Sequence, residues 1–209
     1  MMLTDGHAAL VANNAPVGPP RAGSVVEGYA PFRTVFDVTW SGRRHVVMGA
    51  SQIDRFGNQN ISAIGPPSRP SAQLLGLRGA PGNAINHTVT YWIPNHSRRV
   101  FVDHVDIVCA PGYDRLRDLP PASSRSFEIR RVVSNLGVFD FATHDNTMRL
   151  VSRHPGVAID EILRATAFDL EICEATPQTR VPSSAELDLL RNEIDPRAMR
   201  RSDFPELAG

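Results

Sequence analysis

The sequence predicts a mixed α/β domain with many short strands, and three observations support this prediction. Runs of β-branched and aromatic residues recur at strand length, as at residues 88–93. Segments with apolar residues at helical spacing stand between such runs, as at residues 159–167. The 209 residues are 42% hydrophobic, which suffices for one sizeable core. We therefore expect a single domain spanning residues 1–209.

The first half of the chain alternates loops with short regular elements. Residues 13–23 are rich in Pro, Gly and Asn, which is typical of an exposed loop. Apolar residues near helical spacing predict a short helix at residues 32–40, and β-prone apolar residues predict a buried strand at residues 46–49. Residues 88–93 form the clearest strand pattern. Residues 100–108 alternate less cleanly and predict a strand or a short helix–strand unit.

The second half predicts more of the same sheet. Two apolar stretches separated by Asn135 and Gly137 indicate an antiparallel hairpin or a kinked strand within residues 129–141. Residues 148–152 should continue the sheet. Residues 159–167 should form a helix that buries Ile162, Leu163 and residues 165–167.

The last elements have local signals of their own. Residues 168–172 alternate apolar with acidic side chains, the pattern of a half-buried strand. Ser183 and Glu186 have the spacing of a capping box, which predicts a helix over residues 187–194. The sequence Asp195-Pro196 should end that helix.

Composition excludes several classes of function. The 22 basic and 22 acidic residues cancel, so no nucleic acid or anionic membrane is expected as a partner. All 22 basic residues are Arg, which excludes a lysine Schiff base or a Walker-type phosphate lysine within this chain. There is neither an apolar run of about 20 residues nor a charged leader followed by a hydrophobic segment. Cys109 and Cys173 form no C-x-x-C pair, so we expect reduced cysteines in a cytoplasmic protein.

The most informative segment is residues 49–60, which follow the predicted strand at 46–49. Its polar side chains Gln52, Asp54, Asn58 and Asn60 fall within one short turn and can bind backbone amides or a ligand. Loops at the carboxyl ends of strands hold the ligands of open α/β sheets. An ordinary Asx-stabilised turn explains the same residues without any ligand.

Residues 49–60 closely resemble a signature of the β subunits of family I coenzyme A transferases. Three further segments resemble the same family: residues 79–83, residues 98–106, and residues 131–140 with 154–157. Together they extend the resemblance over nearly the whole chain, and it is strongest to the branch of ring-opening acyl-CoA hydrolases of bacterial steroid degradation. The resemblance implies a three-layer α/β/α sandwich with a mixed, mostly parallel sheet. Because family β subunits usually begin earlier, we expect the opening βα unit to be missing here.

The chain departs from true transferases at one catalytic position. In the family, a Glu-Asn-Gly motif supplies the glutamate that forms a thioester with CoA. Aligning its glycine with Gly6 places Thr4 at the glutamate position and Asp5 at the asparagine position. A threonine hydroxyl without an activating base is too weak a nucleophile for this exchange. The departure favours the hydrolase branch.

The resemblance also implies which residues form the site. Gly79, Ala80, Pro81, Gly82 and Asn83 stand where the family has a glycine-rich loop whose backbone amides form an oxyanion hole. The residues expected to bind the substrate or CoA are the cation Arg78, the polar side chains of the signature turn, and two residues at the strand end. They are Arg78, Gln52, Asn58, Asn60, Gly49 and Ala50. Either Glu27 or, as we expect, the partner subunit supplies the general base.

The implied partner is a coenzyme A transferase-like α subunit, in a heterodimer or an α2β2 heterotetramer. No cofactor is expected other than CoA as part of the thioester substrate. A metal site is not expected either, since His104 and Asp106 have no third ligand at useful spacing. Two other functions remain open: a conventional transferase moving CoA from an acyl-CoA to a free carboxylic acid, and a truncated, non-catalytic partner subunit.

Overall fold

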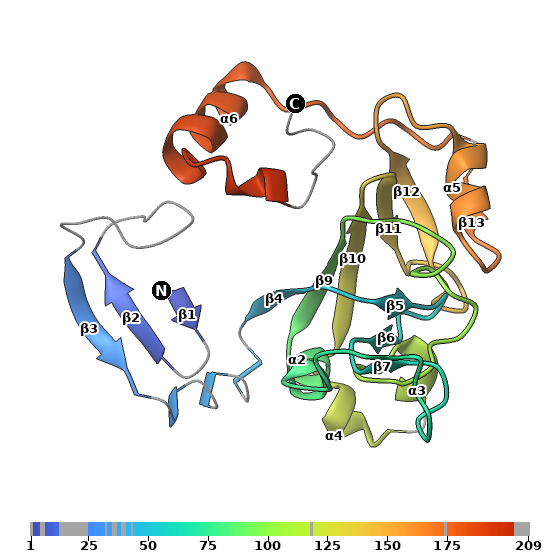
Figure 1. The fold of residues 1–209 in the computed structure, drawn as a ribbon, viewed down its shortest axis with the longest axis horizontal. Coiled ribbons are helices and arrows are strands. Elements are labelled where there is room, and N and C mark those ends of the chain that lie inside the picture. The colour runs from blue at the N-terminus through green and yellow to red at the C-terminus, as the bar shows by residue number, and fades with distance from the viewer. Residues whose placement is uncertain are drawn as a thin grey trace. The chain divides into compact units, whose positions relative to one another are not determined.

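A computed structural model describes residues 2–4, 7–12, 25–31, 33–34, 37–38, 41–42, 44–117, 119–173 and 175–202 (Figure 1). Its contacts divide the chain into two compact units, residues 39–179 and residues 1–38 with 180–209. Each unit is described by itself, and the single domain remains a prediction. The loop expected at residues 13–23 lies outside the described residues. Within the helix expected at residues 32–40, the four residues that are described are helical.

The larger unit is built on a six-stranded sheet with the order β13-β12-β11-β10-β9-β4. The neighbours β4, β9 and β10 are parallel, as are β12 and β13, whereas β11 is antiparallel to both of its neighbours. The sheet is therefore mixed and mostly parallel, and the predicted hairpin is confirmed as β10–β11. The strands are β4 (His45–Met48), β9 (Thr88–Ile93), β10 (Glu128–Ser134), β11 (Gly137–Asp140), β12 (Arg149–Arg153) and β13 (Glu171–Ile172).

Short elements surround the sheet (Figure 1). Two small antiparallel pairs follow β4: β5 (Gln52–Ile53) with β6 (Gln59–Asn60), and β7 (Ala63–Ile64) with β8 (Ala72–Gln73). The helices of this unit are α2 (Ala80–Asn86), α3 (Tyr113–Leu116), α4 (Pro121–Ser124) and α5 (Ile159–Ala165).

The prediction of a strand or a short helix–strand unit at residues 100–108 is wrong. Only Phe101 in this range forms a bridge, and its partner is Ile53 in the turn after β4. Ile53 donates its N–H to the carbonyl of Val100 at 2.7 Å and accepts from the N–H of Val102 at 2.9 Å. The backbone of this range is bonded to the signature turn, so it does not join the sheet.

The elements at residues 159–172 are confirmed with shorter bounds. Helix α5 buries Ile162 as expected, but Leu163 is 41% exposed. Neighbouring residues of a helix point about 100° apart, so Ile162 takes the core position and Leu163 turns away from it. The alternation predicted for residues 168–172 is present in their burial, although only β13 pairs with the sheet.

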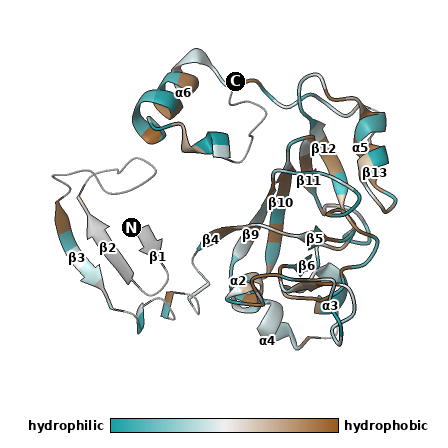
Figure 2. Ribbon diagram, viewed as in Figure 1, coloured by the Kyte–Doolittle hydropathy of each residue, from teal (hydrophilic) through white to brown (hydrophobic). Residues whose placement is uncertain are grey.

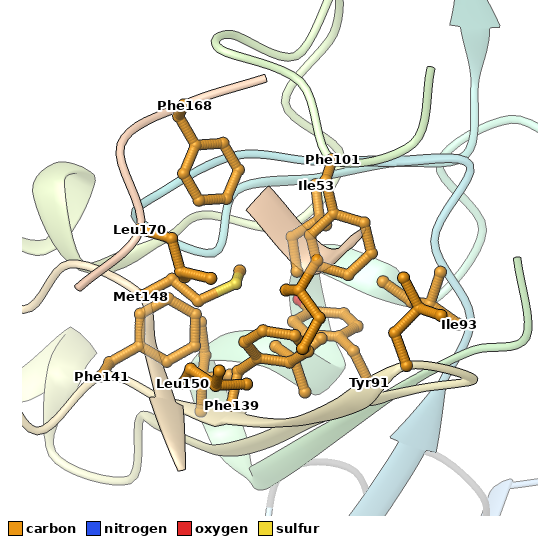
Figure 3. Packing of buried hydrophobic residues seen from close by; sticks show 14 of the residues in the cluster. Ile53, Tyr91, Ile93, Phe101, Phe139, Phe141, Met148, Leu150, Phe168 and Leu170 are labelled. Carbon is orange, nitrogen blue, oxygen red and sulfur yellow. The ribbon is translucent and has the colours of Figure 1, made fainter. Parts of the chain in front are cut away.

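The core of this unit packs against one face of the sheet (Figure 3). In β9, Val89, Tyr91 and Ile93 are buried and the residues between them are half-buried. Phe101 and Phe139 pack at a ring-centroid distance of 5.8 Å. Hydrophobic and hydrophilic positions are mixed along the strands of the sheet as well as along α5 (Figure 2).

A buried histidine ties three parts of this core together. The ring of His96 stacks on Phe101 at 3.5 Å, and its nitrogens lie 3.0 Å from the hydroxyls of Ser134 and Thr166. Because the Thr166 hydroxyl donates to the carbonyl of Ile162, we infer that Nε2 of His96 donates to Thr166 and Nδ1 accepts from Ser134. Burial lowers the pKa of His96 from 6.5 to about 3.

The lowered pKa of His96 predicts a loss of stability in acid. Below pH 6.5 His96 takes up a proton in the unfolded chain but stays neutral in the folded chain. The stabilisation that depends on neutral His96 is therefore complete above pH 6.5. It falls toward pH 3 by up to about 1.4 kcal/mol per pH unit. Urea unfolding at pH 7, 6 and 5 measures the slope, which should be smaller in His96→Gln. An equal slope in both proteins would contradict the prediction.

The smaller unit contains a three-stranded antiparallel sheet and a helical segment. The strands are β1 (Met2–Thr4), β2 (His7–Val11) and β3 (Val26–Ala30). Helix α6 (Ser184–Leu189) continues into the π-helical turn Leu190–Ile194, and a 3-10 turn follows at Met199–Ser202. The predicted capping box is confirmed by reciprocal bonds between Ser183 and Glu186, and it starts the helix three residues before the predicted residue 187. In the described ranges, no helix is both long and apolar enough to cross a membrane.

Candidate active site

The candidate site lies at the carboxyl end of β4, where the signature turn and the start of α2 meet. The side-chain amide of Gln59 donates to the carbonyl of Gly49 at 2.6 Å, which holds the strand end against the turn. Met48 packs against the cluster that contains Ala80 of α2, and Asn83 Nδ2 lies 3.9 Å from Met48 Sδ. The structure therefore brings the predicted residues of the strand end, the signature and the oxyanion segment together.

Gln52 and Asn60 are buried and bonded to the protein itself. Gln52 Oε1 accepts from Asn60 Nδ2 at 2.7 Å and from the N–H of Asp106 at 3.0 Å. Gln52 Nε2 donates to Asp106 Oδ2 at 2.9 Å, and the same oxygen accepts from the N–H of Gly65 at 2.8 Å. Asn60 also donates to the carbonyl of Ala63. Asp106 is exposed, and its bonds to Gln52 and Gly65 connect three segments of the chain.

Asn58 occupies the centre of a second buried network. Its Nδ2 donates to Asp54 Oδ2 and to Asp114 Oδ1, both at 2.9 Å, and its Oδ1 accepts from the N–H of Gly112 at 2.8 Å. Asp54 also accepts from the N–H groups of Phe56 and Asn58 at 3.0 Å. Burial raises the pKa of Asp54, and these three bonds oppose that effect. Asn58 is thus engaged on every side, so its direct contact with a ligand stays a prediction.

The segment Gly79–Asn83, expected as a glycine-rich loop, is a helix start. Helix α2 begins at Ala80, because Gly79 serves as its N-cap and Pro81 has the backbone angle of a first helical turn. The N–H of Ala80 donates to Leu77 and that of Asn83 donates to Gly79, while Pro81 has no N–H. Among these five residues, the backbone N–H groups of Gly79 and Gly82 form no hydrogen bond within the described parts of the chain. These two amides are the donors that an oxyanion could use.

The remaining predicted residues lie in different surroundings. Arg78 is exposed and has a φ of 48°, directly before the helix. Ala50 is half-buried and follows Gly49 at the strand end. Glu27 is exposed on β3 and Thr4 ends β1, both in the smaller unit. The binding role of Arg78 and the catalytic role of Glu27 stay predictions.

Sequence reasoning missed Asp106, Gly112 and Asp114 as parts of this site. They lie 54 to 56 residues from their partners Gln52 and Asn58, and no spacing along the chain connects them. Their residue types were the only available signal, since Gly and Asp favour turns wherever they occur. The described residues also contain no group of three His, Cys, Asp or Glu side chains placed to bind a metal.

Tyr91 is buried beneath the signature turn with its hydroxyl unpaired among the described residues. Burial is the main cause that raises the pKa of this hydroxyl, with smaller effects from Asp54 and Cys109. An unpaired buried hydroxyl opposes folding. Tyr91→Phe should therefore leave stability unchanged or raise it by about 1 kcal/mol.

The matched control for this change is Tyr113→Phe. The Tyr113 hydroxyl bonds both the N–H and the carbonyl of Ile129, at 3.2 and 3.3 Å. Its removal should lower the free energy of unfolding by about 1–2 kcal/mol. Urea unfolding of both variants measures the difference. A larger loss from Tyr91→Phe than from Tyr113→Phe would contradict the prediction.

Comparison with known proteins assigns the chain to a family. The family described as coenzyme A transferase matches residues 34–165. Over 200 residues, the chain is 50% identical to the cholesterol ring-cleaving hydrolase IpdB subunit of Mycobacterium tuberculosis (strain H37Rv), covering 96% of this chain and 80% of that relative.

Solved structures show the same relationship. The crystal structure of Rhodococcus jostii RHA1 IpdAB matches with a TM-score of 0.87 and 50% identity, covering 96% of this chain and 79% of that chain. Glutaconate coenzyme A-transferase from Acidaminococcus fermentans matches with a TM-score of 0.74 and 26% identity, covering 88% of this chain and 76% of that one. These likenesses confirm the predicted fold class, and the chain belongs to the coenzyme A transferase family.

Proposed function

We propose that this chain is the β subunit of a heteromeric enzyme that hydrolytically opens the ring of a steroid-derived cyclic keto-acyl-CoA. The observation that supports this most is the 50% identity, over 96% of the chain, to subunits named as cholesterol ring-cleaving hydrolases in Mycobacterium and Rhodococcus. The likeness to the IpdAB structure supports a coenzyme A transferase-like α subunit as the partner. The resulting enzyme is a heterodimer or an α2β2 heterotetramer.

The reaction is a hydrolytic carbon–carbon cleavage. Water adds to the ring ketone and forms a tetrahedral adduct. When the adduct collapses, a carboxylic acid forms and the electron pair of the broken bond moves to the carbon next to the thioester. Negative charge then develops on the thioester oxygen as an enolate, until that carbon takes up a proton. One N–H donor aimed at such an oxygen contributes about 3 kcal/mol to lowering the barrier.

In this chain the donors would be the backbone amides of Gly79 and Gly82, whose N–H groups are unengaged within the described residues. The networks around Gln52 and Asn58 hold the strand end and the turn in place behind them. The acyl-CoA substrate brings CoA with it, and the proposed reaction needs no other cofactor. Reduced cysteines, free at positions 109 and 173, agree with a cytoplasmic location.

The base that activates water is proposed to lie on the partner subunit. The carboxylate of Asp54 in the signature turn accepts hydrogen bonds from Phe56 and Asn58, and that of Asp106 accepts from Gln52 and Gly65, so both are engaged within this chain. The isolated chain should therefore be inactive, and activity should appear on addition of the partner. Assays of each subunit alone and of the mixture test this, and turnover by this chain alone would contradict it.

A conventional coenzyme A transferase is the second candidate. It is favoured by 30% identity over 154 residues to one of the subunits of glutaconate CoA-transferase from Acidaminococcus fermentans, covering 71% of this chain and 56% of that relative. It is opposed by the lower identity and by Thr4, which aligns with the position where transferases have their catalytic glutamate.

One experiment separates the two candidates. The chain is co-expressed with its α subunit, and the purified complex receives a cyclic β-keto acyl-CoA with and without a free carboxylic acid. Mass spectrometry follows the CoA products. Gain of one water with an intact thioester, independent of the acid, establishes ring opening. A new acyl-CoA that requires the acid would instead establish a transferase.

A further inference from the structure

Two leucines are exposed on the segment that leads into the candidate oxyanion site. Leu75 is 74% exposed and Leu77 is 46% exposed. Both lie in residues 74–79, between β8 and α2, and Gly79 at the end of this segment has one of the two unengaged amides. Large apolar side chains next to a polar site indicate contact with an apolar ligand or partner.

The segment is held in place at both ends. The N–H of Leu74 donates to the carbonyl of Ser62 at 2.8 Å, and the N–H of Ala80 donates to that of Leu77 at 3.1 Å. Between these bonds, Gly76 and Arg78 have φ values of 82° and 48°. A non-glycine residue in the left-handed region is uncommon and costs energy, so the surrounding structure must fix this turn. The leucines are presented by a defined turn that stands next to the site.

Further aliphatic side chains pack near the start of α2. Ala80 is buried in a small cluster, against which Met48, Ile61 and Ile107 pack while remaining partly exposed. The unengaged amides of Gly79 and Gly82 therefore lie close in sequence both to the exposed leucines and to Ala80, against whose cluster these partly exposed aliphatic side chains pack.

We propose that Leu75 and Leu77 are specificity-determining residues that contact the hydrocarbon rings of the acyl group. This inference rests on the proposed function. A steroid-derived acyl group has a rigid apolar body attached to one ketone and one thioester, so its site must place two apolar walls beside oxyanion donors. The segment at 74–79 supplies an apolar wall within the same turn that supplies Gly79.

The experiment compares the complex containing Leu75→Ser and Leu77→Ser with the wild-type complex. A change of size in an apolar contact alters kcat/KM by about 10- to 200-fold. For a steroid-derived keto-acyl-CoA, the double variant should lose about 10- to 100-fold in kcat/KM. Inhibition by free CoA, which lacks the acyl group, should be unchanged, and so should the assembly with the α subunit in size-exclusion chromatography.

The matched control is Leu163→Ser, which changes a leucine on α5 whose exposure of 41% is close to that of Leu77. In Figure 1, α5 and α2 lie at opposite ends of the larger unit. This variant should keep the wild-type kcat/KM. An unchanged kcat/KM in the double variant would overturn the inference, as would an equal weakening of CoA inhibition. Loss of assembly would also overturn it, because the leucines would then form the subunit interface.

Ring opening by the wild-type complex tests the proposed function, on which this inference rests, separately from the role of the leucines. If the wild-type complex fails to open the ring, the proposed function fails and this role fails with it. If the wild type opens the ring and the double variant does so equally well, only the role of the leucines is refuted.

Discussion

Gly112→Ala should prevent the larger unit from folding stably, with a loss of about 3 kcal/mol or more in the free energy of unfolding. A Cβ atom on Gly112 would lie 2.4 Å from the carbonyl oxygen of Phe56 and 2.6 Å from the nitrogen of Asn58. Both are backbone atoms, so no side-chain rotation relieves the overlap. The two segments are also bonded together, since the N–H of Tyr113 donates to Phe56 at 2.9 Å and that of Gly112 donates to Asn58.

The control for this substitution is Gly49→Ala. The nearest atom to a Cβ at that position is the carbonyl oxygen of Trp92, at 3.9 Å, which is an ordinary contact. Neither glycine has a positive φ, so the two substitutions differ in available space. Urea unfolding of both variants at pH 7 measures the effect. Equal stability of the two would show that the signature turn can move away from Gly112.

Asn58→Asp should have the second largest effect, with a loss of about 3–5 kcal/mol at pH 7. The side chain of Asn58 now donates to two carboxylates, Asp54 and Asp114, from a single nitrogen. A carboxylate there would remove both donated bonds and place three negative charges together. Because one of them must take up a proton to restore a donor, its pKa in the folded protein is raised. The loss relative to wild type should therefore be largest at pH 7 and smaller at pH 5.

The matched control is Asn135→Asp. Asn135 is exposed and uses its side-chain oxygen to accept the N–H of His96 at 2.8 Å, which a carboxylate also accepts. The free energy of unfolding of the Asn135→Asp variant should stay within about 0.5 kcal/mol of the wild-type value. Urea midpoints of both variants at pH 7 and pH 5 measure the difference. A pH-independent loss in the Asn58 variant would contradict the charge explanation.

Local patterns predicted the sheet well because its strands are short and regular. The run at β9 was predicted with its observed ends, since β-branched and aromatic residues alternate there between core and half-buried positions. The capping box at Ser183 was predicted because both of its partners lie within four residues. In each case the determining contacts are close along the chain or fall on one face of one element.

The errors occur where distant segments decide the structure. Residues 100–108 have the apolar content of a strand, but Ile53 bonds the backbone of Val100 and Val102, and Gln52 Oε1 accepts the N–H of Asp106. The family resemblance predicted a glycine-rich loop at the segment Gly79–Asn83, which contains glycine and proline. Proline in a first helical turn is equally compatible with a helix start, and α2 packs its buried alanines against Cys109 and Ala110. The sequence around Gly79 does not contain that partner.

The signature turn engages most of its polar side chains in hydrogen bonds within this chain. Asn58, Asn60 and Gln52 bond to Asp54, Asp106, Asp114 and backbone atoms. A related enzyme that acts on a different acyl group can therefore keep this turn unaltered, because the polar residues of the turn hold the fold together. Searches that rely on this motif should recover enzymes with many different reactions, and substrate assignment should instead compare the residues that precede α2.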